Sequence, residues 1–530
     1  MHIVMTREKI INTYLPNNTL TQGFGRVILI PVDEKQLHEL CLSLSLKGLP
    51  LKNMFACDDT ISDSSFRIFY VFGVPVENFF LVPYLTLIGT TEFPSLTPVL
   101  HQASVYEPYI HEMFGLVPIG YPGALGSVVL HEAGNTTRFP MRINQGIVPG
   151  SVSAQSALQE WEFLNVDGEG IFEVPVGPVH AGIIEPGHFR FAMAGEIIAH
   201  LEAKLGWVHK GTEKLFEKIP LAQAIRLSER IAGDTSFAHS VAFANAIETL
   251  GGIKISNRAK YLRVIYGELE RMANHCSDIG YILSDTGLNF GGAQCSRLRE
   301  QLMRYCDKLT GSRFLRGVNT IGGVQCDINK ETGEQLLRDL RVIQNDLRET
   351  LDIVSESSIL ANRMEGTGTL HNDIVKNHDA VGVAARASGI ACDARIDFPY
   401  AAYDELSLPI IVLHAGDVHA RFMVRISEFN ASIELIEQAL RAMPEGELSS
   451  GGNIITLPPN SLAVGIAEGW RGDICYCVLT DAVGKVKRVS ARDPSFINWH
   501  LVPHAAQGNV LLDFPLINKS FNLSYSGFDR

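Results

Sequence analysis

The sequence predicts an α+β protein, with a small N-terminal α+β domain and a larger domain that holds a central helix bundle and peripheral β-hairpins. Three patterns support this prediction. The first 120 residues alternate strand-like runs with a helical stretch, residues 220–360 show successive helical patterns, and the C-terminal part changes to the two-residue period of strands. At 530 residues the chain is also too long for one ordinary hydrophobic core.

Residues 1–120 are expected to form the small domain. Strand-like runs lie at Arg26–Pro31, Phe66–Val74 and Asn78–Ile88, and Lys35–Leu46 has the pattern of a helix. Glycine and proline then punctuate residues 121–175, with YPG at 121–123 and VPG at 148–150. This stretch is therefore predicted to be an extended linker or docking arm.

Residues 176–530 are expected to form the large domain. Its clearest helix spans Asn257–Ile282, where apolar side chains recur every three or four residues and form one stripe. Several such helices in succession favour a bundle. Near the C-terminus, Ile474–Leu479 and Lys485–Ser490 flank a Thr-Asp-Ala-Val-Gly turn and predict a β-hairpin.

The composition restricts the class of protein. A hydrophobic content of 46% and a charged content of 19% are typical of a well-buried globular chain. A formal net charge of −13 argues against a nucleic-acid partner. The first residues lack the pattern of a signal peptide. The most apolar stretch, residues 68–89, is interrupted by Pro75 and Pro83, so it predicts buried strands and any membrane association is expected to come through partner subunits.

Nine cysteines are scattered along the chain, and none forms a CxxC pair. Cysteines in such a pattern are mostly reduced core residues. Only Cys475 and Cys477 lie close together, and two ligands on one short strand do not complete a metal site. No metal site is therefore predicted in this chain.

Several segments after residue 176 occur in an order that is typical of one family. They are GPVHAGIIEPGHFRF (177–191), HKGTEKL (209–215), GSRF (311–314), IGGV (321–324), RMEGTGTL (363–370), DFPYAAYDEL (397–406) and GDVHARFMVR (416–425). On these motifs, residues 176–530 resemble the large subunit of membrane-bound, formate-hydrogenlyase-type (group 4) NiFe hydrogenases and the quinone-pocket subunit of respiratory complex I. The resemblance implies a hydrogenase-like fold for the large domain.

The N-terminal domain carries a second resemblance. YEPYIHEMFGL at 106–116 resembles the signature of the small hydrophilic subunit of complex I, although Pro108 and His111 depart from its commoner residues. In that family the domain has a docking role and holds no cofactor. Residues 1–120 are therefore interpreted as a fused docking domain.

The chain lacks the cysteines that hold nickel and iron in these hydrogenases. The family motifs R-x-C-G-x-x-C and D-P-C-x-x-C supply four thiolates, because soft anionic sulfur binds nickel strongly. Here Ala232 stands in place of the first cysteine, none of Asp234, Thr235 and Ser236 supplies the second thiolate, and Ser495 and Asn498 replace the two cysteines of the second motif. Their hydroxyl and amide groups stay protonated near neutral pH, so the resemblance implies a branch with a degenerate NiFe site.

The complex I chemistry carries over only in part. Asp285 matches an acidic residue behind the family's quinone pocket, and the pocket histidine corresponds to His180 or His188. Gly233 stands about where the family has its quinone-binding tyrosine, and Leu315 replaces the histidine that hydrogen-bonds the cluster. The residues predicted as catalytic are His180, His188, Arg230, Asp285 and Asp493, and those predicted to face a cofactor are Arg230 and Gly233.

His180 and His188 also have an ordinary structural interpretation. With Glu185 they lie in a loop bounded by glycines, where histidines are usually only hydrogen-bonded. On the family interpretation they line the mouth of a cavity and relay protons, because imidazole is the side chain best matched to proton transfer near neutral pH. Both interpretations stay open at this point.

Four further residues leave similar alternatives. Arg230 either stabilises a reduced cluster in a partner subunit or forms a plain salt bridge nearby. Asp493 is either a surviving acid in the former metal cavity or the start of a turn. Arg271 and His275 are one turn apart on a helix, which favours a role in the helix itself.

The resemblance implies a subunit of a membrane-associated, ion-translocating respiratory oxidoreductase complex. It implies electron transfer from a [4Fe–4S] cluster in an iron–sulfur small subunit to an acceptor, expected to be quinone, with no cofactor bound by this chain. An upstream dehydrogenase would supply electrons, and antiporter-like and other membrane subunits would hold the chain on the cytoplasmic side of the inner membrane. NAD binding is implied only at the level of the family. The alternative is a non-catalytic scaffold that joins an electron-transfer module to a membrane ion translocator.

Overall fold

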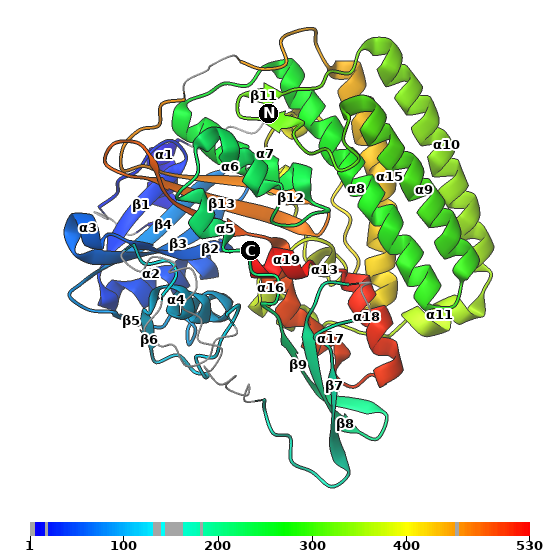
Figure 1. Cartoon of the computed structure of the whole chain (residues 1–530), viewed down its shortest axis with the longest axis horizontal. Coiled ribbons are helices and arrows are strands. Elements are labelled where there is room, and N and C mark those ends of the chain that lie inside the picture. Colours follow the sequence, from blue (N-terminus) through cyan, green and yellow to red (C-terminus); the bar gives the residue numbers. More distant parts are fainter. Residues whose placement is uncertain (1–5, 16–19, 131–138, 144–162, 181–183, 451–454) are drawn as a thin grey trace, which may run out of the picture.

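The computed structural model describes residues 6–15, 20–130, 139–143, 163–180, 184–450 and 455–530. Within these residues the fold is α+β, and the predicted fold class is confirmed. A small N-terminal domain lies at one side of the molecule and a bundle of long helices lies at the other (Figure 1).

The N-terminal domain is built on a four-stranded sheet in the order β1-β4-β3-β2, in which β1 and β4 are parallel and the other pairs are antiparallel. Its elements are α1 (Arg7–Tyr14), β1 (Val27–Val32), α2 (Glu34–Leu46), β2 (Leu51–Asp58), α3 (Thr60–Asp63), β3 (Ser65–Val74), β4 (Phe79–Ile88), β5 (Glu92–Pro94), α4 (Tyr106–Phe114) and β6 (Val117–Ile119).

Helix α2 begins at a capping box. The Asp33 carboxylate accepts hydrogen bonds from the backbone N–H groups of Lys35 and Gln36, and Gln36 Oε1 accepts one from the backbone N–H of Asp33. The helix then buries Leu37 and Leu44 in the core. The predicted helix is confirmed, with a start that differs by one residue.

The large domain contains the protruding sheet β7-β8-β9, the buried sheet β12-β13-β14, a two-stranded sheet of β10 and β11, and the helix bundle. Its strands are β7 (Ile171–Val176), β8 (His188–Ala194), β9 (Ile197–Lys204), β10 (Asn319–Thr320), β11 (Gly323–Val324), β12 (Leu462–Gly469), β13 (Gly472–Thr480) and β14 (Val486–Arg492). Its long helices are α7 (Ser236–Gly251), α8 (Asn257–Asp285), α9 (Asn289–Thr310), α10 (Lys330–Ser355) and α15 (Val418–Ala442). Its short helices are α5 (Thr212–Phe216), α6 (Leu221–Ser228), α11 (Ser358–Met364), α12 (Asn372–Asn377), α13 (Gly382–Arg386), α14 (Ala394–Asp397), α16 (Pro494–Asn498), α17 (Val502–Ala506), α18 (Phe514–Phe521) and α19 (Tyr525–Asp529).

Among the described residues, no helix combines the length and the apolar character needed to cross a bilayer.

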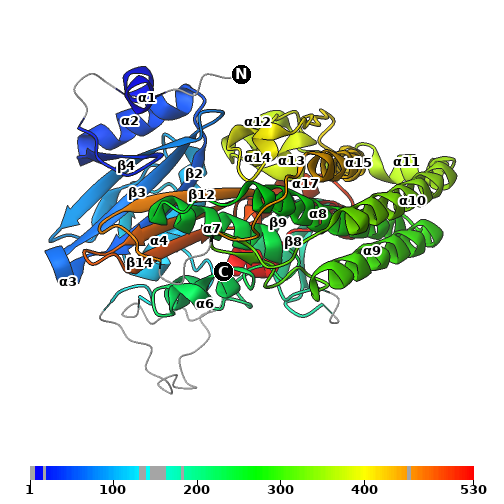
Figure 2. The same cartoon turned by 90° about the horizontal axis from the view of Figure 1, so that it is seen from above.

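The N-terminal sheet lies against the sheet β12-β13-β14 of the large domain (Figure 2). Phe55 and Val71 share one apolar cluster with Val464 on β12, so the N-terminal sheet is buried on its second face as well. Across the same contact, Lys52 Nζ lies 2.9 Å from Asp473 Oδ2, and both side chains are buried. The two domains therefore meet through a continuous core.

The stretch predicted as an arm, residues 121–175, is described only in part. The Glu112 carboxylate accepts hydrogen bonds from the backbone N–H groups of Val128, Val129 and Leu130, which holds this segment against α4. Strand β7 begins at Ile171, so the last residues of the predicted arm belong to the sheet β7-β8-β9 instead. Residues 131–138 and 144–162 of the predicted arm lie outside the described residues.

Helix α8 runs through the middle of the bundle and contacts α7, α9, α15 and α18 (Figure 1). The predicted apolar stripe, which includes Leu262 and Leu269, is buried. Charged side chains on other sides of the helix, among them Glu268 and Arg271, are buried as well. The stripe thus describes only part of a helix that neighbours surround.

Candidate functional site

A cavity of about 280 Å³ lies where α8, α9 and α18 meet the chain at residues 522–526. Gly233 and Asp234, in the loop before α7, and Arg471, in the turn between β12 and β13, complete its wall. Of its fifteen lining residues only Ile184 and Leu523 have aliphatic side chains. The cavity is therefore polar and adjoins the loop in which the family carries its first pair of metal ligands.

An ion pair closes one wall of this cavity. Two guanidinium nitrogens of Arg471 lie 2.7 and 2.8 Å from the two Asp234 carboxylate oxygens, and the guanidinium also stacks 3.8 Å from the ring centre of Trp470. Desolvation alone would raise the pKa of the Asp234 carboxyl, but the Arg471 charge outweighs it and the pKa lies below its ordinary value. Asp234 is therefore an anion already matched by a fixed cation.

The residues that stand in place of the metal ligands serve the protein's own structure. Ala232 is fully buried. The Ser236 hydroxyl donates to Gly233 O at 3.0 Å, and the Ser495 hydroxyl oxygen accepts from Ser524 N–H at 3.0 Å. Asn498 Nδ2 donates to Val381 O at 3.0 Å.

No cysteine is among the described residues that line the cavity, and these described residues contain no group of three or more His, Cys, Asp or Glu side chains placed to hold a metal ion. The donor set therefore does not fit a nickel–iron centre. The predicted pair Cys475 and Cys477 is buried within the apolar contact between the two sheets.

Nickel analysis checks this directly. The purified native complex is expected to contain far less than one nickel per chain, because hydroxyl, amide and methyl groups replace the thiolates. A group 4 hydrogenase that keeps its cysteines is the matched control for the purification. Stoichiometric nickel that copurifies with this chain would contradict the assignment.

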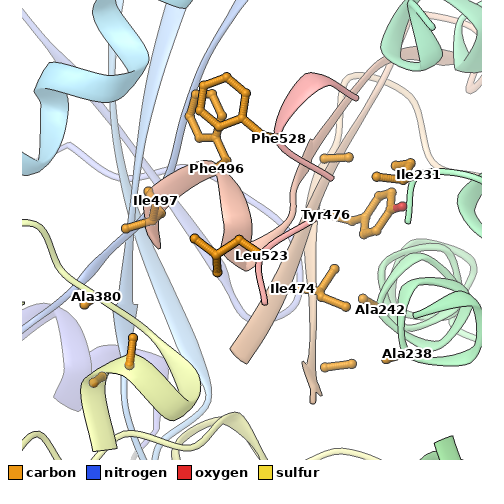
Figure 3. Close-up of a cluster of buried hydrophobic side chains, with 14 of the residues drawn as sticks. Ile231, Ala238, Ala242, Ala380, Ile474, Tyr476, Phe496, Ile497, Leu523 and Phe528 are labelled. Carbon is orange, nitrogen blue, oxygen red and sulfur yellow. The ribbon is translucent and has the colours of Figure 1, made fainter. Parts of the chain in front are cut away.

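Asp493 belongs to a buried hydrogen-bonded chain that the sequence analysis did not find. His239 Nε2 lies 2.9 Å from Asp493 Oδ2, and His239 Nδ1 lies 3.0 Å from the Tyr476 hydroxyl. Figure 3 shows Tyr476 on β13 directed toward α7, with Ala242 and Ile474 nearby. Burial alone would raise the pKa of the Asp493 carboxyl, but His239 outweighs burial and the pKa lies below its ordinary value. His239 lies on α7, far in sequence from Asp493, so no local motif signals this pair.

Asp493 is also the N-cap of a helix. Its Oδ1 accepts from Ser495 N–H at 2.7 Å, at the start of α16. The turn expected at this residue is therefore observed, and its role as an acid in a former metal cavity stays a prediction.

Of the other predicted residues, the structure brings only Gly233 to the cavity wall. Arg230 is exposed, and its carbonyl oxygen accepts from Lys210 Nζ at 2.7 Å. Asp285 is half-buried near the C-terminal end of α8, and burial raises the pKa of its carboxyl while Lys519 and Arg363 oppose the shift. Arg230 and Asp285 therefore do not line the cavity.

Of the two predicted histidines, His188 is the first residue of β8 and His180 lies in the segment between β7 and β8. His180 Nε2 lies 2.7 Å from Gly187 O, and its ring contacts Phe189. The His188 ring contacts Phe163, and burial lowers the pKa of His188 below its ordinary value. Neither histidine lines the cavity, and their predicted role in proton transfer stays a prediction.

A second charged cluster, also missed from the sequence, occupies the core of the bundle. It consists of Glu268, Arg271, His275, Arg386, Asp393, Arg395, Glu428 and Glu468, and all of these side chains are at most 3% exposed. We call it the buried ion cluster. Arg271 and His275, predicted to serve their own helix, both face Glu428 on α15, at 3.9 and 2.8 Å. Arg271 and His275 therefore link α8 to α15.

The buried ion cluster reaches toward the cavity through the backbone. Arg271 donates to the carbonyl oxygens of Glu468 and Gly469 at 2.8 and 3.0 Å. These residues end β12, and Arg471 follows them at the cavity wall. The signal in the sequence was the presence of charged residues on every side of the α8 pattern, which is unusual for a helix with a solvated face.

The sequence is similar to known proteins over most of its length. Residues 285–463 and 455–530 match the family described as respiratory-chain NADH dehydrogenase, 49 Kd subunit, and residues 30–145 match the 30 Kd subunit. The chain is 30% identical to formate hydrogenlyase subunit 5 of Escherichia coli (strain K12), over 99% of this chain and 94% of that protein. It is 31% identical to hydrogenase-4 component G of the same organism, over 90% and 83% of the two chains.

A solved structure is similar as well. A chain of the membrane-bound sulfane sulfur reductase, an archaeal respiratory membrane complex, is 28% identical and superposes with a TM-score of 0.64, over 68% of this chain and 99% of that chain. The chain therefore belongs to the family that unites the large subunits of membrane-bound hydrogenases with the 49 kDa subunit of complex I, and it carries a fused 30 kDa-type domain.

Proposed function

We propose that this chain is the acceptor-side subunit of a membrane-associated, ion-translocating oxidoreductase complex. Electrons from a [4Fe–4S] cluster in an iron–sulfur partner subunit would reach an acceptor bound in the cavity beside Gly233 and Asp234. The observation that carries the proposal is the presence of a cavity beside this loop. The residues in place of the metal ligands form hydrogen bonds within the protein and leave the cavity open. The sequence-based expectation for the acceptor is quinone.

An exposed surface beside the cavity supports a partner there. Arg230 is exposed, Phe314 is 40% exposed, and Arg316 reaches Gly233 O at 3.2 Å. A cationic surface next to a cluster stabilises the cluster's reduced, more negative state. We assign this surface to the iron–sulfur small subunit.

Asp285 is proposed to supply protons during acceptor reduction, together with His180 and His188 in the adjoining segments. Asp285 suits this role because burial raises the pKa of its carboxyl. Antiporter-like and other membrane subunits would use the resulting change in charge to move ions, with an upstream dehydrogenase as the electron donor, on the cytoplasmic side of the inner membrane.

The second candidate is a non-catalytic scaffold between an electron-transfer module and a membrane ion translocator. The ion pair of Asp234 with Arg471 favours it, because this pair fills one wall of the cavity with matched charges. On this interpretation the cavity binds no acceptor.

Filling the cavity separates the two candidates. Ser277 is half-buried on α8 and lines the cavity. Ser277→Trp is expected to slow electron transfer through the purified native complex by roughly tenfold or more, because the indole displaces a bound acceptor. Ser277→Ala, the matched control, is expected to stay within about twofold of the wild type. Unchanged electron transfer in a fully assembled Ser277→Trp complex would support the scaffold.

A further inference from the structure

The charged groups that line the cavity do not balance. They are Glu185, Asp234, Arg299, Arg471 and Lys519, which gives three cations and two anions. Arg471 is matched by Asp234 through the bidentate ion pair. The remaining question is which groups match Glu185, Arg299 and Lys519.

Glu185 already has partners of its own. Its carboxylate accepts from Ser526 N–H at 2.9 Å. Its negative charge also raises the pKa of Lys210, which opposes the lowering of that pKa by burial. Glu185 is therefore not a counter-ion for the opposite wall.

Arg299 and Lys519 form no ion pair with any described residue. Both side chains are half-buried, Arg299 on α9 and Lys519 on α18. Arg299 Nε is buried and has no hydrogen-bond partner among the described residues. Lys519 Nζ lies 4.8 Å from the ring centre of Tyr281, another lining residue, which keeps the ammonium at the cavity wall.

The nearest acid behind Lys519 does not cancel this charge. The Lys519 charge lowers the pKa of the Asp285 carboxyl, but the two groups form no ion pair. Burial outweighs this effect and raises the pKa, so that the Asp285 carboxyl holds its proton more strongly. Two cations thus border this cavity without an ion-paired anion among the described residues.

The chemistry of a bound molecule follows from these two cations. The carbonyl oxygens of a neutral quinone accept hydrogen bonds but would leave both positive charges unbalanced, and an isoprenoid tail would find only Ile184 and Leu523 as aliphatic contacts. An anion would supply the negative charge that the two cations lack. The volume of about 280 Å³ holds a small anion with several waters, since each water occupies roughly 30 Å³.

We propose that the cavity is a binding site for a small inorganic anion, held between Arg299 and Lys519. This inference rests on the proposed function, whose acceptor it assigns to a different chemical class from the quinone expected on the sequence. Ser526 also lines the cavity and can add a hydroxyl donor. Charge on oxygen or sulfur atoms satisfies the site equally, so sulfate serves as a probe that is not reduced.

Calorimetric titration of sulfate into the purified, oxidised complex at low ionic strength tests the inference. Saturable binding is expected, because surface cations outside the cavity do not converge on one anion. Arg299→Gln and Lys519→Gln are each expected to weaken sulfate binding by roughly tenfold or more, the usual loss when one charged hydrogen bond is removed.

Lys308→Gln is the matched control, since Lys308 is an exposed cation on α9 that does not line the cavity. It is expected to change sulfate affinity by less than about twofold. Absence of saturable binding, or equal affinity in the wild type, Arg299→Gln and Lys519→Gln, would overturn the anion site.

The failure of this inference is distinguishable from failure of the proposed function. Sulfate binding is measured without electron transfer, whereas Ser277→Trp reports on electron transfer alone. If Ser277→Trp slows electron transfer but the wild type shows no saturable sulfate binding, the anion site is refuted and the acceptor role still holds. Sulfate binding that both variants weaken supports the anion site whatever the turnover.

Discussion

Arg386→Met is expected to lower the free energy of unfolding by about 3–5 kcal/mol, the usual cost of removing one partner from a buried ion pair. Arg386 Nε lies 2.7 Å from Glu428 Oε1, and Nη1 lies 2.9 Å from Glu468 Oε1. Its side chain is 1% exposed. Methionine fills much of the same space but leaves both carboxylates in the core without their cation. Urea denaturation followed by circular dichroism measures the loss.

Arg341→Met is the matched control. Arg341 also bridges two glutamates, Glu434 and Glu437, but its side chain is 39% exposed. Water replaces the lost contacts there, so the expected change is within about 1 kcal/mol. The double variant Arg386→Met with Glu428→Met is expected to regain part of the loss, because it removes one stranded charge. Equal losses of unfolding free energy in Arg386→Met and Arg341→Met would show that the ion pairs of the buried ion cluster contribute no more to stability than exposed ones.

Elements with a strong period could be predicted from the sequence. Phe66–Val74 and Asn257–Ile282 match the observed β3 and α8 within a few residues. Strand β2 was missed because all eight of its residues are buried, so it shows no alternation of apolar and polar side chains. Some of its polar side chains have partners far away in sequence: Asn53 Nδ2, for example, donates to the Ser490 hydroxyl.

The candidate site divides in the same way. The loss of the metal ligands is a property of single positions, so Ala232 and Ser495 reveal it without any structure. The charge of the cavity is not local, because Arg299 and Lys519 come from helices that only the packed bundle brings together. The pairing of His239 with Asp493 depends on how α7 lies on β13. Sequence reasoning therefore identified what the site had lost more readily than what it contains.

The buried ion cluster also makes the protein's stability depend on pH. Its four carboxylates, Glu268, Asp393, Glu428 and Glu468, face three guanidiniums. His275 and, from the neighbouring strand, Asp473 face the same space. Asp473 is already paired with Lys52 and Arg492, so the cluster itself has one carboxylate more than it has guanidiniums. Burial, reinforced by Asp393, raises the pKa of Glu468 to about 7, although Arg386 opposes the shift.

Glu468→Gln is therefore expected to have little effect on stability below the ordinary carboxyl pKa of about 4.3 and to stabilise the protein at neutral and alkaline pH. The folded-state pKa of Glu468 is raised to about 7, so its contribution is complete below the ordinary value and is lost as the pH rises through about 7. Between these two values the wild type should lose up to about 1.4 kcal/mol per pH unit relative to Glu468→Gln, which has no proton to release, and above about 7 the difference should stay constant. Thermal unfolding of both proteins across this range measures the difference.

Glu428→Gln is expected to behave in the opposite way and provides the control. Burial alone would raise the pKa of Glu428, but Arg386 and His275 outweigh it and hold the pKa well below its ordinary value. Glu428 is thus an anion at every pH of the experiment, and Glu428→Gln should destabilise the protein at neutral and alkaline pH alike. Parallel curves for the wild type and Glu468→Gln would mean that Glu468 stays ionised and that the excess charge is neutralised elsewhere, with His275 the nearest candidate. The two variants therefore locate the proton within the cluster, which no stability measurement at a single pH can do.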